Sequence, residues 1–277
     1  DAVVLFQLII YIPVLVFGVL LNTVALWAFC CKLKRWTETR VYMINLMVAD
    51  CFLLFSLPFL IYFTKNKHPI DKLCIAIQMI YFTNGPMSIF IITLIAIDRY
   101  IAIKFPLKAK TLRSPLKSAA ICGFLWIIQI GYSYFNRPFE NKKENENFCF
   151  QKHSIQPDFS LLFSICFRYF IPLGIITFCS IQVIKCLRKQ MASSLHDTKL
   201  IQKALHIVTV NLCVFIVCFS PVYITLLLRL VAEVFEACYL LSKVRVSIQI
   251  FSCFANSNCC FDAFCYYFAA KEFQEFS

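Results

Sequence analysis

The sequence predicts an all-α membrane protein, a bundle of seven transmembrane helices that forms a single domain over residues 1–277. Composition is the first reason: 60% of the residues are hydrophobic and 15% are charged, whereas soluble domains have about 45–50% and about 25%. The second reason is the recurrence of long apolar segments that carry one charge or none. The third is that no polar linker divides the chain, which favours one body over two soluble domains.

Seven segments are long and apolar enough to cross a bilayer, which takes about 20 residues of helix. Lipid cannot satisfy an open backbone, and barrel strands would alternate in polarity, so helices are the expected spanning structure. We expect spans at approximately 2–31, 41–64, 73–103, 116–136, 159–187, 203–230 and 242–268, then a short amphipathic helix at approximately 270–277.

The charges between the spans predict the orientation. Lysine and arginine are more frequent after the first, third, fifth and seventh spans, and the other connections hold most of the acidic residues. By the positive-inside rule the N-terminus is extracellular, and we expect a multi-pass protein of the plasma membrane. A cytoplasmic surface that faces anionic membrane lipids accounts for the net charge of +12, so no nucleic-acid partner is expected.

Polar residues inside the predicted spans are candidates for function, because ionisable groups are costly in hydrocarbon. Asp50 and Asp262 lie in the second and seventh spans at similar depth, and Asn22, Ser88 and Asn258 are expected near that level. These oxygen atoms would suit a sodium ion bound at Asp50 and Asp262. In the alternative, the two carboxyl groups are protonated and hydrogen-bond to the amides.

The third span ends at the cytoplasmic side with Asp98-Arg99-Tyr100. The adjacent acid and base can pair locally, and breaking that pair would free Arg99 for another partner. Pro172 and Pro221 lie inside the fifth and sixth spans. Each removes a backbone hydrogen bond, so we expect both to act as hinges.

The order of these motifs along the whole chain resembles that of the rhodopsin-like (class A) G-protein-coupled receptors. The resemblance rests on Asn22, Asn45-Leu-Met-Val-Ala-Asp50, Asp98-Arg99-Tyr100, Trp126, Pro172 and Phe215-Ile-Val-Cys-Phe-Ser-Pro221. More narrowly, four segments resemble one small branch, that of the kynurenate-responsive orphan receptor and the lysophosphatidylinositol receptor, and are closer to the former. They are Trp36-Thr-Glu-Thr-Arg40, Leu112-Arg-Ser-Pro115, Asn258-Cys-Cys-Phe-Asp-Ala-Phe-Cys-Tyr266 and Lys271-Glu-Phe273.

The resemblance implies a receptor that activates heterotrimeric G proteins, of the inhibitory or the twelve/thirteen class, with arrestin as a further partner. It implies that Asp98, Arg99, Tyr100 and Tyr266 form the coupling switch, and that a disulfide joins Cys74 to Cys149. Two departures stand out: the usual Asn-Pro before Tyr266 is Asp262-Ala263, and Phe219 replaces the tryptophan common in the sixth span.

Three arginines suggest the class of ligand. In the resembled family the position of Arg168, deep in the fifth span, lines the ligand cavity, and Arg229 and Arg137 would flank its opening. Guanidinium groups bind carboxylates and phosphates with two parallel hydrogen bonds. An anionic small molecule or a lysophospholipid would fit them, beside aromatic side chains at Tyr81, Phe219 and Tyr223. In the alternative, Arg229 and Arg137 extend to lipid headgroups, and Arg168 pairs with an internal carbonyl or acid.

Other functional classes have less support. The sequence lacks Gly-x-Ser-x-Gly, His-Glu-x-x-His and a glycine-rich nucleotide loop, so no enzyme is expected. The cysteines lack the spacing of a metal site, and no cofactor is expected beyond the candidate sodium ion. A scavenger or decoy receptor of the same fold, which binds its ligand without signalling, is the alternative to a signalling receptor.

Overall fold

The computed structural model describes residues 2–32, 36–135, 148–150, 159–193 and 198–263. Within these residues seven helices are long and apolar enough to span a membrane, which confirms the predicted fold class. The segment expected to form the amphipathic helix at 270–277, together with Tyr266 and Arg137, lies outside the described residues. The helices and π-helical turns are α1 (Ala2–Trp27), η1 (Ala28–Lys32), α2 (Glu38–Asn66), α3 (Lys72–Lys104), α4 (Pro106–Leu112), α5 (Pro115–Phe135), α6 (Phe159–Ile165), η2 (Cys166–Phe170), α7 (Ile171–Ser193), α8 (Thr198–Val234) and α9 (Cys238–Asn256).

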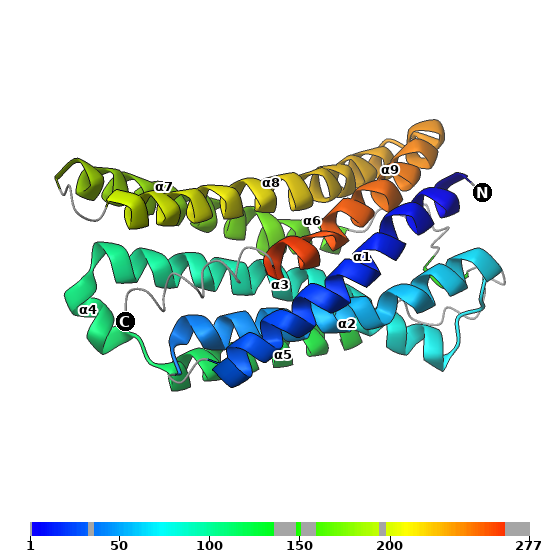
Figure 1. The fold of residues 1–277 in the computed structure, drawn as a ribbon. Coiled ribbons are helices and arrows are strands. Elements are labelled where there is room, and N and C mark those ends of the chain that lie inside the picture. The colour runs from blue at the N-terminus through cyan, green and yellow to red at the C-terminus, as the bar shows by residue number, and fades with distance from the viewer. Residues whose placement is uncertain (1, 33–35, 136–147, 151–158, 194–197, 264–277) are drawn as a thin grey trace.

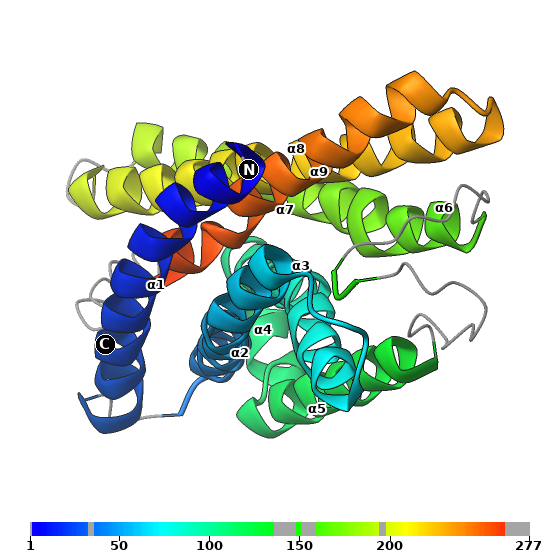
Figure 2. The ribbon, with the colours of Figure 1, turned by 90° about the vertical axis from the view of Figure 1, so that its right-hand side faces the viewer.

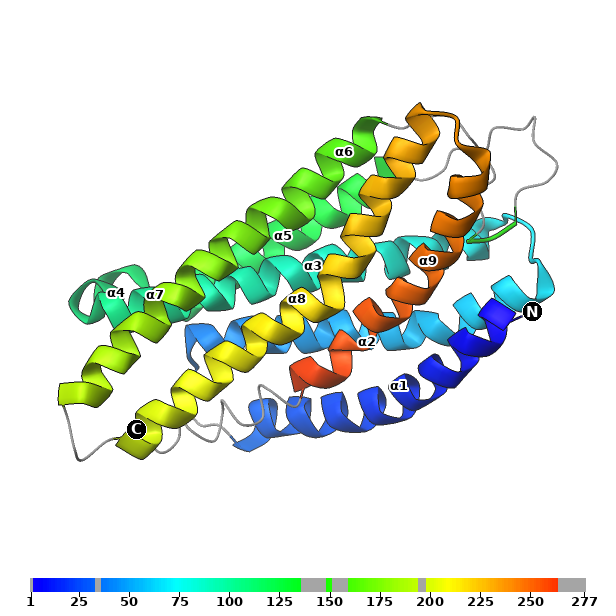
Figure 3. The ribbon, with the colours of Figure 1, turned by 90° about the horizontal axis from the view of Figure 1, so that it is seen from above.

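The helices form an elongated bundle around α3 (Figures 1 and 2). Helix α3 packs against α2, α5 and α7; α8 lies between α7 and α9; and α1 packs on α2 and α9. The connections α2–α3 and α8–α9 lie at the end of the bundle where α1 begins, and α4 lies at the opposite end (Figure 3). We call these the first end and the second end.

Local polar contacts explain where α2 and α3 begin. The side chain of Thr37 accepts a hydrogen bond from the backbone N–H of Arg40, and α2 therefore starts at Glu38, three residues before the apolar run. The carboxylate of Asp71 accepts from the N–H of Cys74 at 2.7 Å. Such caps satisfy amide groups that have no partner within the helix. The N–H of Cys74 also lowers the pKa of Asp71 below its ordinary value.

The interior of the bundle is mostly apolar, and so is much of its outer surface. Leu46, Leu57 and Met87 are completely buried, whereas large side chains such as Phe124 and Ile127 face outward. A soluble protein rarely exposes a continuous apolar surface of this kind. The outward-facing residues therefore agree with a bundle surrounded by lipid.

The sixth span is longer than the sequence predicts. We expected it to end near residue 230 and expected Glu233 in the following loop, but α8 continues to Val234 and Glu233 is buried within it. The guanidinium of Arg229, one turn earlier, lies 2.7 Å from the Glu233 carboxylate. This ion pair offsets the cost of burying the acid and allows the helix to continue.

Candidate ligand cavity and signalling switch

A disulfide fixes the described part of the loop after α5 at the first end of the bundle. Cys74 at the start of α3 is bonded to Cys149, with 6.0 Å between the Cα atoms, which confirms the predicted pair. The N–H of Cys149 donates to the carbonyl of His68 at 2.8 Å. The next residue, Phe150, makes an edge-to-face contact with Tyr81, with ring centroids 5.5 Å apart. The loop therefore covers the end of α3.

A cavity of about 80 Å³ lies between α2, α3, α8 and α9 in the middle of the bundle. Its wall is partly apolar and partly polar, with one carboxyl group, three amides and two hydroxyls. A Cβ atom added to Gly85 would meet no atom within 4 Å, so the missing side chain contributes to the open space. The lining residues are Asp50, Leu53, Asn84, Gly85, Ser88, Phe219, Val222, Tyr223, Ala255, Asn256, Asn258 and Cys259.

Three of the five residues predicted for the sodium site line this cavity, and two do not. Asp50, Ser88 and Asn258 face it, and Oδ2 of Asp50 has no hydrogen-bond partner within the described residues. Asp262 accepts a hydrogen bond from Asn258 at 2.6 Å. Asn22 donates to the backbone carbonyls of Gly18 in α1 and of Cys259, three residues after the end of α9, and thereby ties the two segments together. The carboxylate, hydroxyl and amide oxygen atoms of Asp50, Ser88 and Asn258 are ligands that suit a hard cation.

Asn84 and Asn256 were missed by the sequence analysis. Asn84 accepts from the Ser88 hydroxyl at 3.4 Å. Asn256 donates to the hydroxyls of Tyr81 at 2.9 Å and Tyr11 at 3.0 Å, and so joins α9 to α3 and α1. Tyr81, a predicted ligand residue, is therefore held in place beside the cavity. Amides inside apolar spans are the signal that could have found both.

Four aromatic rings form a stack beside the cavity, one on η2 and three on α8. Tyr223 stacks on Tyr169 with centroids 4.5 Å apart, and Tyr169 stacks on Phe215 at 6.1 Å. Phe215 contacts Phe219 at 5.2 Å. The Tyr169 hydroxyl also hydrogen-bonds to Ser220. Since Phe219 and Tyr223 line the cavity, the stack forms part of its wall.

Arg168 lies in the π-helical turn η2, directly before α7. Pro172 has no N–H to donate to the carbonyl of Arg168, and the N–H of Ile171 bonds instead to Cys166, five residues earlier. A proline therefore accounts for the wider turn. The Arg168 guanidinium lies 3.8 Å from the centroid of the Tyr132 ring, and its Nη2 atom has no hydrogen-bond partner within the described residues.

The other two predicted arginines differ from Arg168. Arg229 is paired with Glu233, 2.7 Å away on its own helix, an arrangement that the sequence analysis did not consider. Arg137 lies outside the described residues. Of the two arginines that the structure describes, Arg229 is paired with a carboxylate, whereas Nη2 of Arg168 has no hydrogen-bond partner within the described residues.

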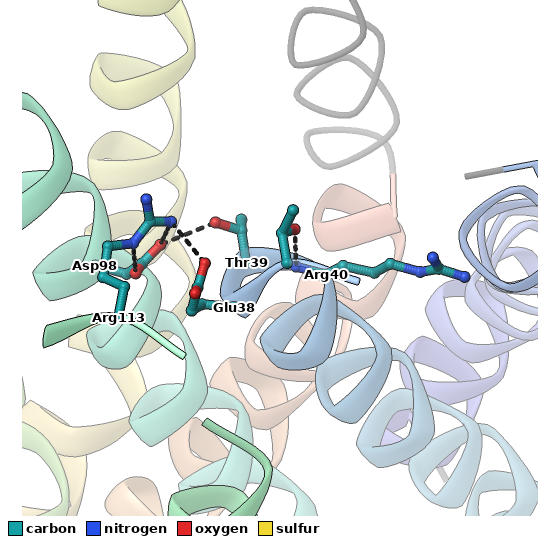
Figure 4. Close-up of polar contacts among 6 residues, drawn as sticks. Glu38, Thr39, Arg40, Asp98 and Arg113 are labelled. Atoms are coloured by element: carbon teal, nitrogen blue, oxygen red, sulfur yellow. Dashed lines mark hydrogen bonds and ion pairs between the residues drawn. The ribbon is translucent and has the colours of Figure 1, made fainter. Parts of the chain in front are cut away.

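At the second end, Asp98 is at the centre of a polar network that joins α2, α3 and the α4–α5 connection (Figure 4). Arg113 donates two hydrogen bonds to Asp98, at 2.7 and 2.9 Å. Thr39 donates a third at 2.8 Å, and Glu38 lies 3.3 Å from Arg113. Burial disfavours the charge on Arg113, but the hydrogen bonds and charge of Asp98 prevail and raise its pKa.

The neighbours of Asp98 in the predicted switch lie close to α7 and α8. Arg99 lines a small cavity of about 30 Å³ between α3, α7 and α8, together with Ser180 and Asn211. Tyr100 contacts Phe178 with centroids 5.8 Å apart. From the sequence we expected Asp98 to pair with Arg99, and we assigned no role to Arg113, Thr39 or Glu38. They lie in the segments Trp36–Arg40 and Leu112–Pro115, whose resemblance to one receptor branch was the available signal.

Comparison with known proteins decides the family. Residues 21–266 match the family described as "7 transmembrane receptor (rhodopsin family)". The chain belongs to this family. It is 43% identical to human G-protein coupled receptor 35 over 263 residues, which cover 95% of this chain and 83% of the relative. It is 35% identical to human G-protein coupled receptor 55, over 97% and 86% of the two chains, and 35% identical to human lysophosphatidic acid receptor 6, over 94% and 79%.

These findings confirm the predicted family and branch. A rhodopsin-family chain is a seven-span membrane receptor that couples to G proteins, and it is not an enzyme.

Proposed function

We propose that this rhodopsin-family receptor resides in the plasma membrane with its first end outside, and that it responds to an anionic small molecule or lysophospholipid. The single observation that carries the proposal is Arg168. Its guanidinium rests on the face of Tyr132, and its Nη2 atom has no hydrogen-bond partner within the described residues. A cation in this setting gains most from a carboxylate or phosphate, which accepts two parallel hydrogen bonds.

The apolar part of the ligand would lie against the aromatic residues. Tyr223, Phe219 and Gly85 line the central cavity, and Tyr81 is held beside it by Asn256. An acid with an aromatic or acyl body fits a site that combines one cation with several rings. The similarity to a lysophosphatidic acid receptor supports the same class of ligand, because lysophosphatidic acid is an anionic phospholipid.

The aromatic stack offers a route from ligand to switch. A ligand in contact with Tyr223 and Phe219 would favour one of two packings of the stack on α8, which carries Pro221. Outward movement of the second end of α8 would open the small cavity beside Arg99 to a G-protein α subunit of the inhibitory or the twelve/thirteen class. The ligand acts by shifting the population between two states. Arrestin would bind the same end.

Two further groups set the balance between these states. The network of Asp98, Arg113, Thr39 and Glu38 stabilises the closed arrangement of α2, α3 and the α4–α5 connection. A sodium ion at Asp50, with Asp262 reached through Asn258, would stabilise the closed state from the central cavity. To activate the receptor, the agonist must bind the open state more tightly than the closed state, by enough to offset the stabilisation from the Asp98 network and from the sodium ion.

The test is G-protein activation in cells, with aromatic acids and lysophospholipids as agonists and a panel of α subunits. Wild type is compared with Arg168→Gln and Arg168→Lys at equal surface expression. The proposal requires that Arg168→Gln loses potency for acidic agonists and that Arg168→Lys retains part of it. Unchanged potency in Arg168→Gln would rule out this residue as the anion site. Ligand binding without activation of any α subunit would favour the decoy alternative.

A further inference from the structure

Two adjacent cysteines end the first span. Cys30 and Cys31 lie in the π-helical turn η1, and both are exposed. They are at the second end of the bundle, opposite to the disulfide between Cys74 and Cys149 (Figure 3). None of the roles proposed for the switch or the cavity uses them.

The start of α2 holds this turn in place. The Nη2 atom of Arg40 donates to the carbonyl of Cys30 at 3.2 Å, and the Arg40 guanidinium lies 4.1 Å from the centroid of the Trp36 ring. Arg40 is itself almost completely buried, at 3% exposure. The two thiols are therefore presented at a fixed depth beside the second helix.

The outer face of α1 leads directly to Cys31. Phe17, Leu20, Val24 and Trp27 are 54–58% exposed, and they precede Cys31 by 14, 11, 7 and 4 residues, the spacing of one face of a helix. This stripe is about 21 Å long at 1.5 Å per residue. In a membrane it contacts acyl chains, and a chain attached to Cys31 would extend along it.

The flanking residues place the thiols at the boundary of the bilayer. Trp27 and Trp36 are both more than half exposed, and tryptophan favours the membrane–water interface. The sequence continues with Lys32, Lys34 and Arg35, which favour the side of anionic lipid headgroups. Cysteines next to a span on this side are the substrates of reversible S-acylation.

We propose that Cys30 and Cys31 form a site of S-acylation by a long-chain fatty acyl group. The cysteine thiolate attacks the thioester carbonyl of a long-chain acyl-coenzyme A. A new carbon–sulfur bond forms, the bond to coenzyme A breaks, and the coenzyme A thiolate leaves and takes up the proton that the cysteine lost. Nothing is oxidised or reduced. The proposal rests on the proposed orientation, which puts the second end in the cytoplasm.

Other exposed cysteines lack this setting. Cys51 follows Asp50 in the middle of α2, where hydrocarbon would keep the thiol protonated and away from the coenzyme. Cys238 is exposed at the first end, where α9 begins. Both serve as controls, the first for the site of acylation and the second for orientation.

The experiment counts thioesters on the receptor from cell membranes by acyl-PEG exchange. Free thiols are blocked, hydroxylamine cleaves thioesters, and each released thiol adds one PEG mass step. Cys30→Ser/Cys31→Ser should lose one or two steps relative to wild type, and Cys51→Ser should lose none. A double variant with as many steps as wild type would overturn the proposal. If the double variant does not reach the membrane, the single variants decide: the proposal requires that at least one loses a step.

Orientation is tested separately on intact cells with a membrane-impermeant maleimide, after thioesters are cleaved. Cys238 should react from outside, and Cys30 and Cys31 only after the cells are permeabilised. Reaction of Cys30 or Cys31 from outside would contradict the proposed orientation, and the acylation proposal with it. Thiols that react only from inside but carry no thioester would contradict acylation and leave the receptor function intact.

Discussion

At the scale of single residues, the proposed class of ligand depends on Arg168. Hydrogen bonds to charged groups contribute about 1.5–3 kcal/mol each. We therefore expect Arg168→Gln to weaken an acidic agonist roughly 10- to 100-fold, and an uncharged analogue of that agonist much less. Concentration–response curves for the acid and its amide or ester measure this. Equal losses for both ligands would mean that Arg168 supports the fold of the pocket and not the anion.

Two glycines in apolar helices, Gly85 and Gly18, allow the packing of the interior to be tested by matched substitutions. A Cβ at Gly85 meets nothing within 4 Å, whereas a Cβ at Gly18 would lie 2.6 Å from Leu54 Cδ2 and 3.5 Å from Cys259 Sγ. Gly85→Ala should therefore stabilise the receptor by about 0.5–1 kcal/mol, and Gly18→Ala should destabilise it by about 1 kcal/mol or more. In detergent, the melting temperature should therefore rise for Gly85→Ala and fall for Gly18→Ala, relative to wild type. A lower melting temperature for Gly85→Ala would mean that the space around it is not open.

Single residues also show what the sequence could predict of the site. Arg168, Asp50 and Asp98 were predictable because a charge inside an apolar span is conspicuous. Arg113 and Glu38 were not assigned to the switch, because both fall outside the predicted apolar spans, where charges are ordinary. Their role depends on distances between helices that no local pattern encodes.

At the scale of elements, hydropathy predicted the number and order of the spans, but local chemistry sets their ends. The N-terminal cap at Thr37 allows α2 to begin before its apolar segment. The Arg229–Glu233 ion pair allows α8 to continue beyond the end of its apolar segment. The π-helical turn η2 was also not predicted, although Pro172 provides its cause. Hydropathy reports burial in lipid, whereas helix ends depend on individual hydrogen bonds.

The network around Asp98 joins three elements, and its removal should favour the open state. Arg113→Ala takes away two hydrogen bonds to Asp98 and the contact with Glu38. If the closed state loses about 1 kcal/mol, the small active population rises roughly fivefold. Agonist-free G-protein activation measures this, with the exposed Lys117→Ala as control. Basal activity equal to that of wild type would show that the network does not restrain the switch.

The loop fixed by the disulfide is a second element with a testable role. Cys149→Ser would release Phe150 from Tyr81 and leave the end of α3 less covered. We expect faster dissociation of the agonist and lower surface expression, while any receptor at the surface still activates G protein at high agonist concentration. Ligand washout kinetics would test this. A dissociation rate equal to that of wild type would contradict the covering role of Phe150.

At the scale of the whole molecule, α3 connects the covered first end with the switch at the second end, and the cavity lies between them. The rings of Tyr223, Tyr169, Phe215 and Phe219 lie along the same route. Phe219→Ala should therefore reduce the maximal response more than it reduces binding, because it loosens the stack that transmits the change. Radioligand binding and G-protein activation, measured on the same membranes, separate the two effects. If agonist binding and the maximal response fell by the same factor, Phe219 would contribute to ligand binding and not to transmission of the signal.

Signalling in response to an anion is tested most directly by nucleotide exchange on purified G-protein α subunits, with the receptor in lipid nanodiscs and an acidic agonist added. Wild type is compared with Arg99→Ala, which leaves the ligand cavity unchanged. We expect the agonist to accelerate exchange with wild type, and we expect Arg99→Ala to bind the agonist equally well but no longer to accelerate exchange. Agonist binding to wild type without faster exchange on any α subunit would contradict the proposed function.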